Sequence, residues 1–524
     1  MCGIAGFCNF KEDFEENTDY WNFRLEKMRA VLAHRGNDAR GRYLKKHIGL
    51  SHSRLAIRDI LCGDQPMTRT HNGYDYTICY NGEIYNTDEL IPELSENGFV
   101  CSTTSDTEVI LYAYIHWGAD FVNRLNGIFA FAIWDAAKSR LLLYRDRVGV
   151  KPLFYAIRGD SLVFGSEPKA CFAHPDKQGL QELLAIGPAH TSGLSLFKDL
   201  FEVLPGHFMI YSRDGLHDET YWELTSREHT ESYRDTVAHT RFLVEDAIKR
   251  QMVSDVPVCT FLSGGIDSSI VTAIAANYMN TRGKTLNTFS FDFKDNDRYF
   301  KANAFQPERD LPYVNRMLEE YETAHSYLEC DENSLFKALF AAVDAKDMPG
   351  MTDVDSSLLY FCSLVSRKNK VALTGECADE IFGGYPWFYR KELLERYGFP
   401  WSSDVAPRLA LLRDDVGFEL DLSGYQAFRY EESRSKAPLL YGEDGEDESR
   451  RIIGYLNIKW FMQTLLDRMD RTSMYSELEA RVPFADHRII EYVFNVPWHM
   501  KYQNGVEKTL LRDAFSDVLP PELL

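Results

Sequence analysis

A buried strand that leads directly into a glycine- and serine-rich turn and a helix constrains the fold of this 524-residue chain more than any other feature. Residues 255–262 form a mainly apolar run, residues 263–269 read Ser-Gly-Gly-Ile-Asp-Ser-Ser, and residues 270–278 are rich in alanine and isoleucine. Glycines let backbone N–H groups approach an anion, and the helix dipole favours negative charge at the helix N-terminus. The segment therefore predicts a strand–turn–helix unit that binds phosphate.

The residues of this turn also narrow the chemistry. The turn lacks the G-x-x-x-x-G-K-[ST] pattern, so the sequence argues against γ-phosphate transfer and favours release of pyrophosphate. Ser-Gly-Gly-Ile-Asp-Ser-Ser resembles the pyrophosphate loop of the AMP-forming ATP pyrophosphatases. That resemblance implies an α/β domain of the adenine-nucleotide α-hydrolase-like (PP-loop) class, built on a parallel sheet.

A second strand and glycine turn, in residues 371–385, carries an acidic cluster. Glu376, Asp379 and Glu380 place three carboxylates within five residues, which suits Mg²⁺ coordination or general acid–base work beside a phosphate site. A solvated acidic first turn of a helix is the alternative interpretation. Farther along, Arg468 and Lys508 belong to basic segments that suit a substrate carboxylate or a charged transition state, or else surface salt bridges.

Cys2 follows directly after the initiator methionine. Removal of Met1 would place a thiol and an α-amine on one Cα. A neutral amine with a pKa of about 7.7–8.0 accepts the proton of a thiol with a pKa of about 8.5 near pH 7, as in N-terminal nucleophile pairs. The alternative is a chance cysteine in a short apolar strand, but the sequence that follows favours the nucleophile.

Several segments of the first 150 residues have the character of a glutamine pocket. Arg54 lies at the mouth of an apolar run. Asn81 and Gly82 offer a side-chain amide and a backbone N–H that together can hold a developing oxyanion. Asp106 lies in an acidic first turn of a predicted helix, or else faces an ammonium group. Charged turns at residues 34–38 and 145–153 complete the series.

These segments resemble, in order, the class II glutamine amidotransferases over roughly residues 2–210. The resemblance implies an α+β N-terminal nucleophile domain with an αββα sandwich fold. It implies that Cys2 is the nucleophile and that Asn81 and Gly82 form the oxyanion hole. It places Arg54 on the α-carboxylate of glutamine. The implied glutamine-binding residues are Arg54, Leu55, Ala56, Ile57, Arg58, Asn81, Gly82, Glu83 and Asp106, with Glu83 and Asp106 on the amino end.

The two halves in this order resemble the glutamine-hydrolysing asparagine synthetases over nearly the whole chain. The resemblance implies that Glu376 assists formation of β-aspartyl-AMP and that Asp267 and Asp379 hold Mg²⁺. The residues implied near aspartate and pyrophosphate are Asp379, Arg468 and Lys508. The implied ATP-binding residues are Phe261, Leu262, Ser263, Gly264, Gly265, Asp267, Ser268, Phe291, Thr374 and Gly375.

The predicted organisation is a glutaminase domain at residues 2–211, a polar linker at 212–232 and a synthetase domain at 233–524. Relatives usually continue beyond the position of Leu524, so we expect a C-terminus that is truncated or naturally short. Two positions depart from the family pattern. Asn37 replaces a proline that usually shapes its loop, and Cys377 replaces a glycine, where we interpret it as a tolerated neighbour of the site.

The bulk composition fits a cytoplasmic enzyme with two full cores, since 45% of the residues are hydrophobic. A net charge of −21 argues against nucleic acid or an anionic membrane surface as partner. Ten cysteines without a C-x-x-C pair argue against zinc and a disulfide framework. No signal peptide or membrane span is predicted. The oligomeric state stays open, with a homodimer as one option.

The function that the resemblance implies is ATP-dependent synthesis of asparagine, with glutamine, aspartate and ATP as substrates and Mg²⁺ as cofactor. Because free ammonia would be protonated and lost in water, we expect an internal passage between the two sites. Two related alternatives remain: an amidotransferase-ligase that amidates another carboxylate, and a β-lactam-synthetase-like enzyme. A non-catalytic glutamine or nucleotide sensor is the alternative from a different class, although it has no need of Cys2 or Glu376.

Overall fold

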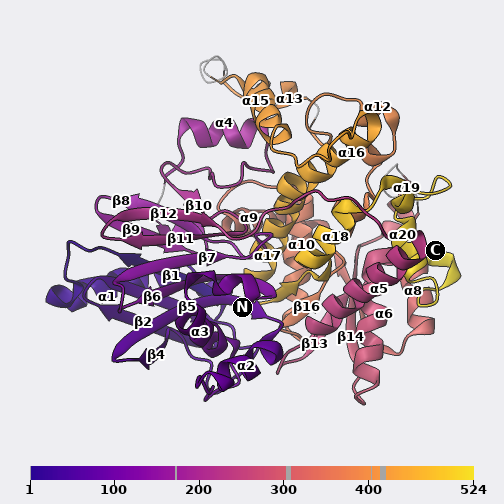
Figure 1. The fold of residues 1–524 in the computed structure, drawn as a ribbon. Coiled ribbons are helices and arrows are strands. Elements are labelled where there is room, and N and C mark those ends of the chain that lie inside the picture. Colours follow the sequence, from indigo (N-terminus) through magenta and orange to yellow (C-terminus); the bar gives the residue numbers. More distant parts are fainter. Residues whose placement is uncertain (1, 172–173, 303–307, 403, 414–419) are drawn as a thin grey trace.

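The first half of the chain forms two six-stranded antiparallel sheets, with helices outside them (Figure 1). The computed structural model describes residues 2–171, 174–302, 308–402, 404–413 and 420–524. The first sheet has the order β10-β8-β9-β1-β3-β2, with β1 (Cys2–Cys8), β2 (Ala39–Lys45), β3 (Ile48–Arg54), β8 (Phe154–Arg158), β9 (Ser161–Gly165) and β10 (Phe201–Glu202). The second has the order β12-β11-β7-β6-β5-β4, with β4 (Met67–His71), β5 (Tyr74–Ile84), β6 (Gly127–Asp135), β7 (Arg140–Arg145), β11 (His207–Ser212) and β12 (Gly215–Thr220). The helices of this half are α1 (Thr18–Ala30), α2 (Thr87–Glu96), α3 (Asp106–Trp117) and α4 (Lys177–Ala185).

The burial of β1 explains why this half has four layers. All seven residues of β1 are buried, although side chains of a strand alternate between its two faces. Ile4 shares a hydrophobic cluster with Ala130 of the second sheet, whereas Phe7 shares another with Leu25 of α1. A strand with an apolar layer on each side belongs inside an αββα sandwich, and this confirms the predicted fold of the first half.

The second half is built on a five-stranded sheet in which every neighbouring pair is parallel. Its order is β15-β14-β13-β16-β17, with β13 (Val258–Phe261), β14 (Leu286–Phe293), β15 (Thr323–Cys330), β16 (Val371–Leu373) and β17 (Glu479–Arg481). The central strand β13 runs through the glycine turn into α6 (Ile266–Asn280). Val258 and Cys259, on opposite faces of β13, pack into different hydrophobic clusters, as expected for a parallel sheet buried on both sides. The predicted PP-loop class is confirmed.

Helices surround this parallel sheet (Figure 1). The longer ones are α5 (Tyr233–Arg250), α8 (Leu311–Glu320), α9 (Glu332–Lys346), α10 (Thr352–Val365), α15 (Leu422–Arg434), α16 (Gly445–Leu456), α17 (Met462–Met474) and α18 (His487–Asn495). The shorter ones are α7 (Asn296–Tyr299), α11 (Ala378–Phe382), α12 (Lys391–Leu394), α13 (Ala406–Leu409), α19 (Trp498–Lys501) and α20 (Thr509–Ala514). Among the described helices, none combines the length and apolar character that crossing a membrane requires.

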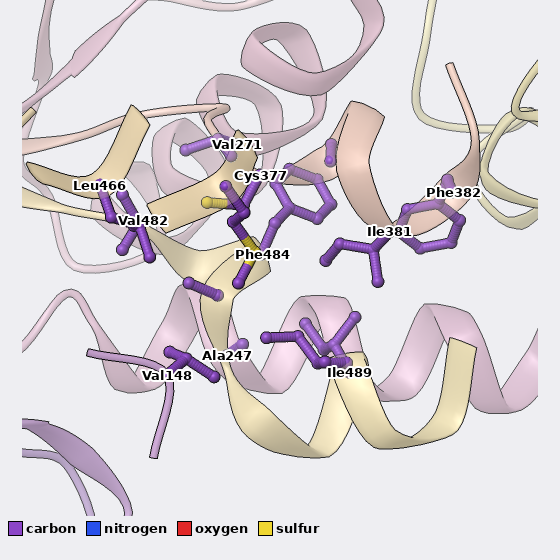
Figure 2. Packing of buried hydrophobic residues seen from close by; sticks show 14 of the residues in the cluster. Val148, Ala247, Val271, Cys377, Ile381, Phe382, Leu466, Val482, Phe484 and Ile489 are labelled. Carbon is purple, nitrogen blue, oxygen red and sulfur yellow. The ribbon is translucent and has the colours of Figure 1, made fainter. Parts of the chain in front are cut away.

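One hydrophobic cluster joins the two halves. Val148, from the charged turn after β7, belongs to the same cluster as Val482, which follows β17, and Ile489 of α18 (Figure 2). The cluster also holds Cys377 and Phe382 beside the acidic turn. The acidic turn of residues 371–385 therefore rests on a core that the first half helps to complete.

The structure differs from the sequence prediction in the linker. Strand β12 lies inside residues 212–232, and it pairs antiparallel with β11 from His207↔Thr220 to Ser212↔Gly215. Most of β12 is solvent-exposed, and the strand lies at the edge of its sheet. Its polar sequence therefore lacked the apolar alternation that predicts a strand. Helix α6 also begins earlier than predicted, at Ile266, with Gly265 as its N-cap residue.

Candidate active sites

Cys2 and Asn81 meet where the start of β1 faces β5. The backbone N–H of Cys2 donates to Asn81 Oδ1 at 2.9 Å, and both residues are buried. Asn81 Nδ2 has no hydrogen-bond partner in the described part of the chain. A buried polar group left unpaired costs about 1–3 kcal/mol, so this amide is a ready donor for an oxygen that gains negative charge during a reaction.

The Cys2 thiol lies in a buried, low-dielectric position, with Sγ 4.0 Å from Leu55 O. Burial raises the pKa of this thiol, while the positive charge of the N-terminus, a hydrogen bond with the Leu55 backbone and the positive charge of Arg54 act in the opposite direction. A thiol with a raised pKa stays protonated near neutral pH. Nucleophilic attack by Cys2 therefore needs a base that accepts its proton.

Position 82 requires glycine, because a side chain would not fit there and because the backbone conformation favours glycine. Its φ is +156°, and a Cβ at this position would lie 2.2 Å from Ile128 O on the neighbouring strand β6. Only glycine keeps β5 and β6 paired here. The pairing holds the backbone beside the Asn81 amide.

Arg54 is buried, and its guanidinium is held by the segment that follows it. Nη1 donates to Asp64 Oδ1 at 2.9 Å and Nη2 donates to Asp59 O at 2.6 Å. The Asp64 side chain is 75% exposed, so it can turn into solvent at little cost. A carboxylate of this chain thus occupies the partner position that the resemblance assigned to the α-carboxylate of glutamine.

Most of the predicted glutamine-binding residues line one pocket of about 330 Å³. The predicted residues that line it are Cys2, Arg54, Leu55, Ile57, Arg58, Gly82, Glu83 and Asp106. Asp106 accepts hydrogen bonds from Tyr80 Oη at 2.9 Å and from the Ile84 N–H at 3.0 Å. Ala56 and Asn81 are not among the lining residues, and Ala56 instead donates its N–H to Asp38. Residues that line the pocket but escaped prediction are Gly63, Gln65, Tyr80, Ser105 and Thr107.

The predicted phosphate-binding turn is closed by hydrogen bonds of its own serines. Ser263 and Ser268 are joined by their hydroxyl groups at 2.9 Å, and Ser268 Oγ donates to Gly265 O. Gly264 has a φ of +83°, a conformation that favours glycine. A Cβ at Gly375 would lie 2.7 Å from the Ser268 N–H nitrogen. The predicted ATP-binding residues Ser263–Ser268 and Thr374–Gly375 therefore lie side by side.

Lys508 joins the two predicted metal-binding carboxylates. Its Nζ lies 2.8 Å from Asp267 Oδ2 and 2.8 Å from Asp379 Oδ1. Burial raises the pKa of Asp267 to about 6, with the charge of Lys508 opposing the rise. Asp267 Oδ1 has no hydrogen-bond partner among the described residues. Since Mg²⁺ is usually bound by one or two carboxylates together with substrate phosphates, this free oxygen fits a ligand.

Glu376 and Arg468 form a third ion pair of this site, with Arg468 Nη2 3.0 Å from Glu376 Oε1. Cys377 follows in the left-handed conformation, at a φ of +79°, which explains why glycine suits that position. Burial raises the pKa of the Cys377 thiol well above its usual value. A buried thiol with a raised pKa agrees with the prediction that Cys377 is a tolerated neighbour of the site rather than a nucleophile.

Phe261 and Phe291 share an apolar surface near the carboxyl ends of β13 and β14. Both rings pack against Phe361 of α10, with centroid distances of 4.6 Å and 5.3 Å. Neighbouring Leu262 is buried in the core and donates its N–H to Phe289 O. An apolar surface beside a phosphate-binding turn suits the base of a nucleotide.

Sequence reasoning missed the buried charge network between the two halves. Arg35 Nε donates to Cys2 O at 3.1 Å, and its Nη1 and Nη2 pair with Glu167 at 2.9 Å and Asp470 at 2.9 Å. Lys151 Nζ donates to the other oxygen of Asp470 at 3.0 Å. All four of these charged side chains are buried. The sequence shows a charged turn in the first half and a charged helix in the second half. Neither segment by itself indicates which residues it will contact.

Glu83 of the first half also contacts a residue of the second half. Its Oε1 lies 3.6 Å from Arg481 Nη2, and its Oε2 has no hydrogen-bond partner in the described ranges. Burial raises the pKa of Glu83 well above its usual value. Arg481 Nε also donates to Glu479 on the same strand. Glu83 therefore links the glutamine pocket to β17 of the parallel sheet.

Comparison with known proteins decides the family of this chain. Residues 239–524 match the family model described as asparagine synthase, and residues 1–222 match the glutamine amidotransferase domain. Glutamine-hydrolysing asparagine synthetase 3 of Bacillus subtilis is 48% identical, over 100% of this chain and 86% of that protein. The chain belongs to the glutamine-hydrolysing asparagine synthetase family.

More distant similarity extends beyond proteins named as asparagine synthetases. Asparagine synthetase 1 of B. subtilis is 29% identical, over 100% of this chain and 85% of that protein. Amidase chyE of Penicillium rubens is likewise 29% identical, over 100% of this chain and 87% of that protein. The greater identity to the first relative places this chain nearer to that asparagine synthetase than to the amidase.

Proposed function

We propose that this chain makes asparagine from aspartate, with ammonia released from glutamine and with ATP cleaved to AMP and pyrophosphate. One observation carries the proposal: this member of the asparagine synthetase family has two sites, one suited to releasing ammonia from glutamine and one suited to activating a carboxylate with ATP. A buried cysteine faces an unpaired amide in the first half, and a phosphate-binding turn faces a lysine–carboxylate cluster in the second.

In the glutaminase half, Cys2 Sγ attacks the carboxamide carbon of glutamine. The thiol proton passes to the free α-amine that Cys2 gains when Met1 is removed. Asn81 Nδ2 and the Gly82 N–H donate to the oxyanion of the tetrahedral intermediate. Transfer of the proton to the leaving nitrogen releases ammonia and leaves a thioester, which water hydrolyses to glutamate and free Cys2.

Arg54 and Asp106 position glutamine for this attack. The α-carboxylate displaces Asp64 from the Arg54 guanidinium, which is already oriented by the backbone carbonyls of Asp59 and Ile60. The α-ammonium group faces Asp106 and Glu83. Opposite charges at the two ends of the pocket fix the direction in which the substrate side chain points.

In the synthetase half, residues 263–268 bind the phosphates of ATP, and Lys508 neutralises their negative charge. An oxygen of the aspartate side-chain carboxylate attacks the α-phosphorus, pyrophosphate leaves, and β-aspartyl-AMP forms. Ammonia then attacks the acyl carbon, loses a proton and expels AMP, which gives asparagine. Glu376 and Arg468 lie beside this reaction centre, while Phe261 and Phe291 offer an apolar surface for the adenine.

Mg²⁺ fits the same cluster, with Asp267 and Asp379 as its protein ligands. When bound, it would neutralise the phosphates and polarise the α-phosphorus. Lys508 would then release one of the two carboxylates and shift toward the pyrophosphate. The unpaired Asp267 Oδ1 supports this assignment.

We also propose an internal passage for ammonia and a cytoplasmic location, and a homodimer stays one option for the assembly. The buried contacts between the two halves support the passage, and ten unpaired cysteines support a reducing compartment. The net charge of −21 supports the proposal that neither nucleic acid nor an anionic membrane surface is a partner.

An isotope experiment tests the proposal. Aspartate labelled with ¹⁸O in its side-chain carboxylate should pass one labelled oxygen to AMP when ATP, Mg²⁺ and glutamine or ammonium are present. Glu376→Ala should suppress this transfer and leave glutaminase activity measurable. ADP as the product, or AMP without the label, would contradict the acyl-adenylate. Label from another acid, with aspartate inert, would replace the substrate, and the similarity to amidase chyE makes that arm of the test necessary.

A further inference from the structure

The segment between α5 and β13, residues 251–257, belongs to the synthetase half but contacts the glutamine pocket. Asp255 makes two hydrogen bonds to the loop that follows Arg54. Its N–H donates to Ile57 O at 3.0 Å, and its Oδ2 accepts from the Asp59 N–H at 2.8 Å. Ile57 itself lines the pocket. One residue of the second half therefore holds the pocket loop at two points.

Asp59 connects the two ends of the glutamine pocket. Its carbonyl oxygen accepts from Arg54 Nη2 at 2.6 Å, which orients the guanidinium assigned to the α-carboxylate of glutamine. Its side chain accepts from two backbone N–H groups, that of Cys62 at 2.9 Å and that of Thr104 at 2.8 Å. Thr104 lies two residues before Asp106, which is assigned to the amino end of glutamine. The position of Asp59 therefore affects both ends of the pocket at once.

The backbone of Asp59 needs contacts that hold it in place. Its φ is +45°, in the left-handed region, and the residue is 9% exposed. Residues other than glycine are uncommon in this region, and they persist there when the surrounding structure fixes them. Because Asp59 is largely buried, its N–H also needs an acceptor from the protein. The carboxylate of Asp255 is that acceptor.

The segment that carries Asp255 is itself fixed within the synthetase half. The buried guanidinium of Arg481, on β17, donates through Nη1 to Gln251 O at 2.6 Å and to Val253 O at 2.5 Å. On the other side of Asp255 the chain enters β13, the central strand of the parallel sheet. Asp255 is therefore attached at both sides to the framework of the second half, and it can serve as a fixed point for the pocket loop.

We propose that Asp255 is a positioning residue for glutamine, which acts through Asp59. Asp255 is not among the described residues that line the pocket. By holding Asp59, it keeps Arg54 and the turn before Asp106 at the separation that the two charged groups of glutamine require. The glutamine pocket of the first half is thus completed by a residue of the second. This inference rests on the proposed function, because it takes glutamine as the substrate of the Cys2 site.

Steady-state glutaminase kinetics of the full chain test this role. Asp255→Ala should raise KM for glutamine about two- to tenfold, the effect of one lost hydrogen bond. Its kcat should change little, since Cys2 and Asn81 keep their positions. Asp255→Asn retains an oxygen that can accept from the Asp59 N–H, so it should restore most of the native KM. Both variants should fold, because Asp255 is exposed.

Two controls accompany these variants. Ammonium-dependent synthesis should proceed at the native rate in Asp255→Ala and Asp255→Asn, because that reaction needs no glutamine pocket. Asp214→Ala removes an exposed aspartate from the turn between β11 and β12, and it should leave KM for glutamine unchanged.

Three results with an active native glutaminase would each overturn this inference. They are an unchanged KM in Asp255→Ala, no recovery of KM in Asp255→Asn, and an equal loss of ammonium-dependent synthesis, which would assign Asp255 a role in the fold as a whole. A native protein that does not hydrolyse glutamine would instead contradict the proposed function, and this inference with it. The native glutaminase assay therefore tells the two failures apart.

Discussion

Arg35 Nη2 lies 2.9 Å from Asp470 Oδ2, and this contact joins the turn behind the Cys2 nucleophile to helix α17 of the synthetase half. The same guanidinium donates to Cys2 O. Burial on its own would raise the pKa of Asp470, but the charges of Arg35 and Lys151 lower it. Asp470 is therefore an ionised group held inside the protein by two cations from the opposite domain.

Removing this carboxylate should weaken the attachment between the domains. Asp470→Ala leaves Arg35 and Lys151 without it in the interior, and breaking a buried pair costs about 3–5 kcal/mol. We expect a lower urea midpoint and a loss of glutaminase activity. Asp160→Ala is the control, because Asp160 pairs with Lys11 on the exposed surface and such pairs contribute about 0–1 kcal/mol. Equal effects of the two changes would contradict a structural role for Asp470.

The active protein should begin at Cys2. A retained Met1 would block the α-amine that accepts the thiol proton and would crowd the buried Sγ. Intact-mass measurement of protein with glutaminase activity should therefore show a chain that lacks Met1. A glutaminase-active preparation in which every chain carries Met1 would eliminate this base.

Cys2→Ala should separate the two reactions. Glutamine-dependent synthesis should be abolished, because no thioester can form. Ammonium-dependent synthesis should continue at nearly the native rate, since Cys2 does not contact the adenylate. Product analysis with each nitrogen source provides the measurement, and loss of both activities in a folded variant would assign Cys2 a structural role.

Arg54 and Asp64 should have opposite effects on the glutamine requirement. Arg54→Ala removes a charge-assisted hydrogen bond worth about 1.5–3 kcal/mol, so KM for glutamine should rise about ten- to a hundredfold. Asp64→Asn removes a competing surface carboxylate worth about 0.2–1 kcal/mol, so KM should fall by a factor of about 1.5 to 5. Steady-state glutaminase kinetics measure both. A rise in KM for Asp64→Asn would mean that Asp64 helps to bind glutamine.

The pair of His190 and Glu202, 3.2 Å apart in the first half, predicts a pH dependence of stability. Burial alone would lower the pKa of His190, but the charge of Glu202 raises it to about 9. The stabilisation by protonated His190 is therefore complete below about pH 6.5 and is lost as the pH rises through 9. The difference in unfolding midpoint between the native protein and His190→Gln should shrink from pH 6 to pH 9. A difference that stays constant would mean that His190 is neutral throughout.

Local chemistry made much of this protein predictable. The turn at residues 263–269 and the Asn81-Gly82 pair could be identified from the sequence, because phosphate and oxyanion binding depend on residues that are adjacent in the chain. The ion pair of Glu83 with Arg481 could not be predicted, because Arg481 lies far along the chain and only the fold brings the two residues together. The burial of Arg35, Lys151 and Asp470 was hidden for the same reason. Edge strand β12 escaped because an exposed strand needs no apolar alternation.

Helix α17 carries Arg468, which pairs with Glu376 in the synthetase site, and Asp470, which pairs with Arg35 behind the nucleophile. Only Met469 separates these two residues, so one helix serves both reactions. The domains are consequently not interchangeable modules. A chimera that joins this synthetase half to a foreign amidotransferase half must also import Arg35 and Lys151, or substitute Asp470, before it can fold as a unit.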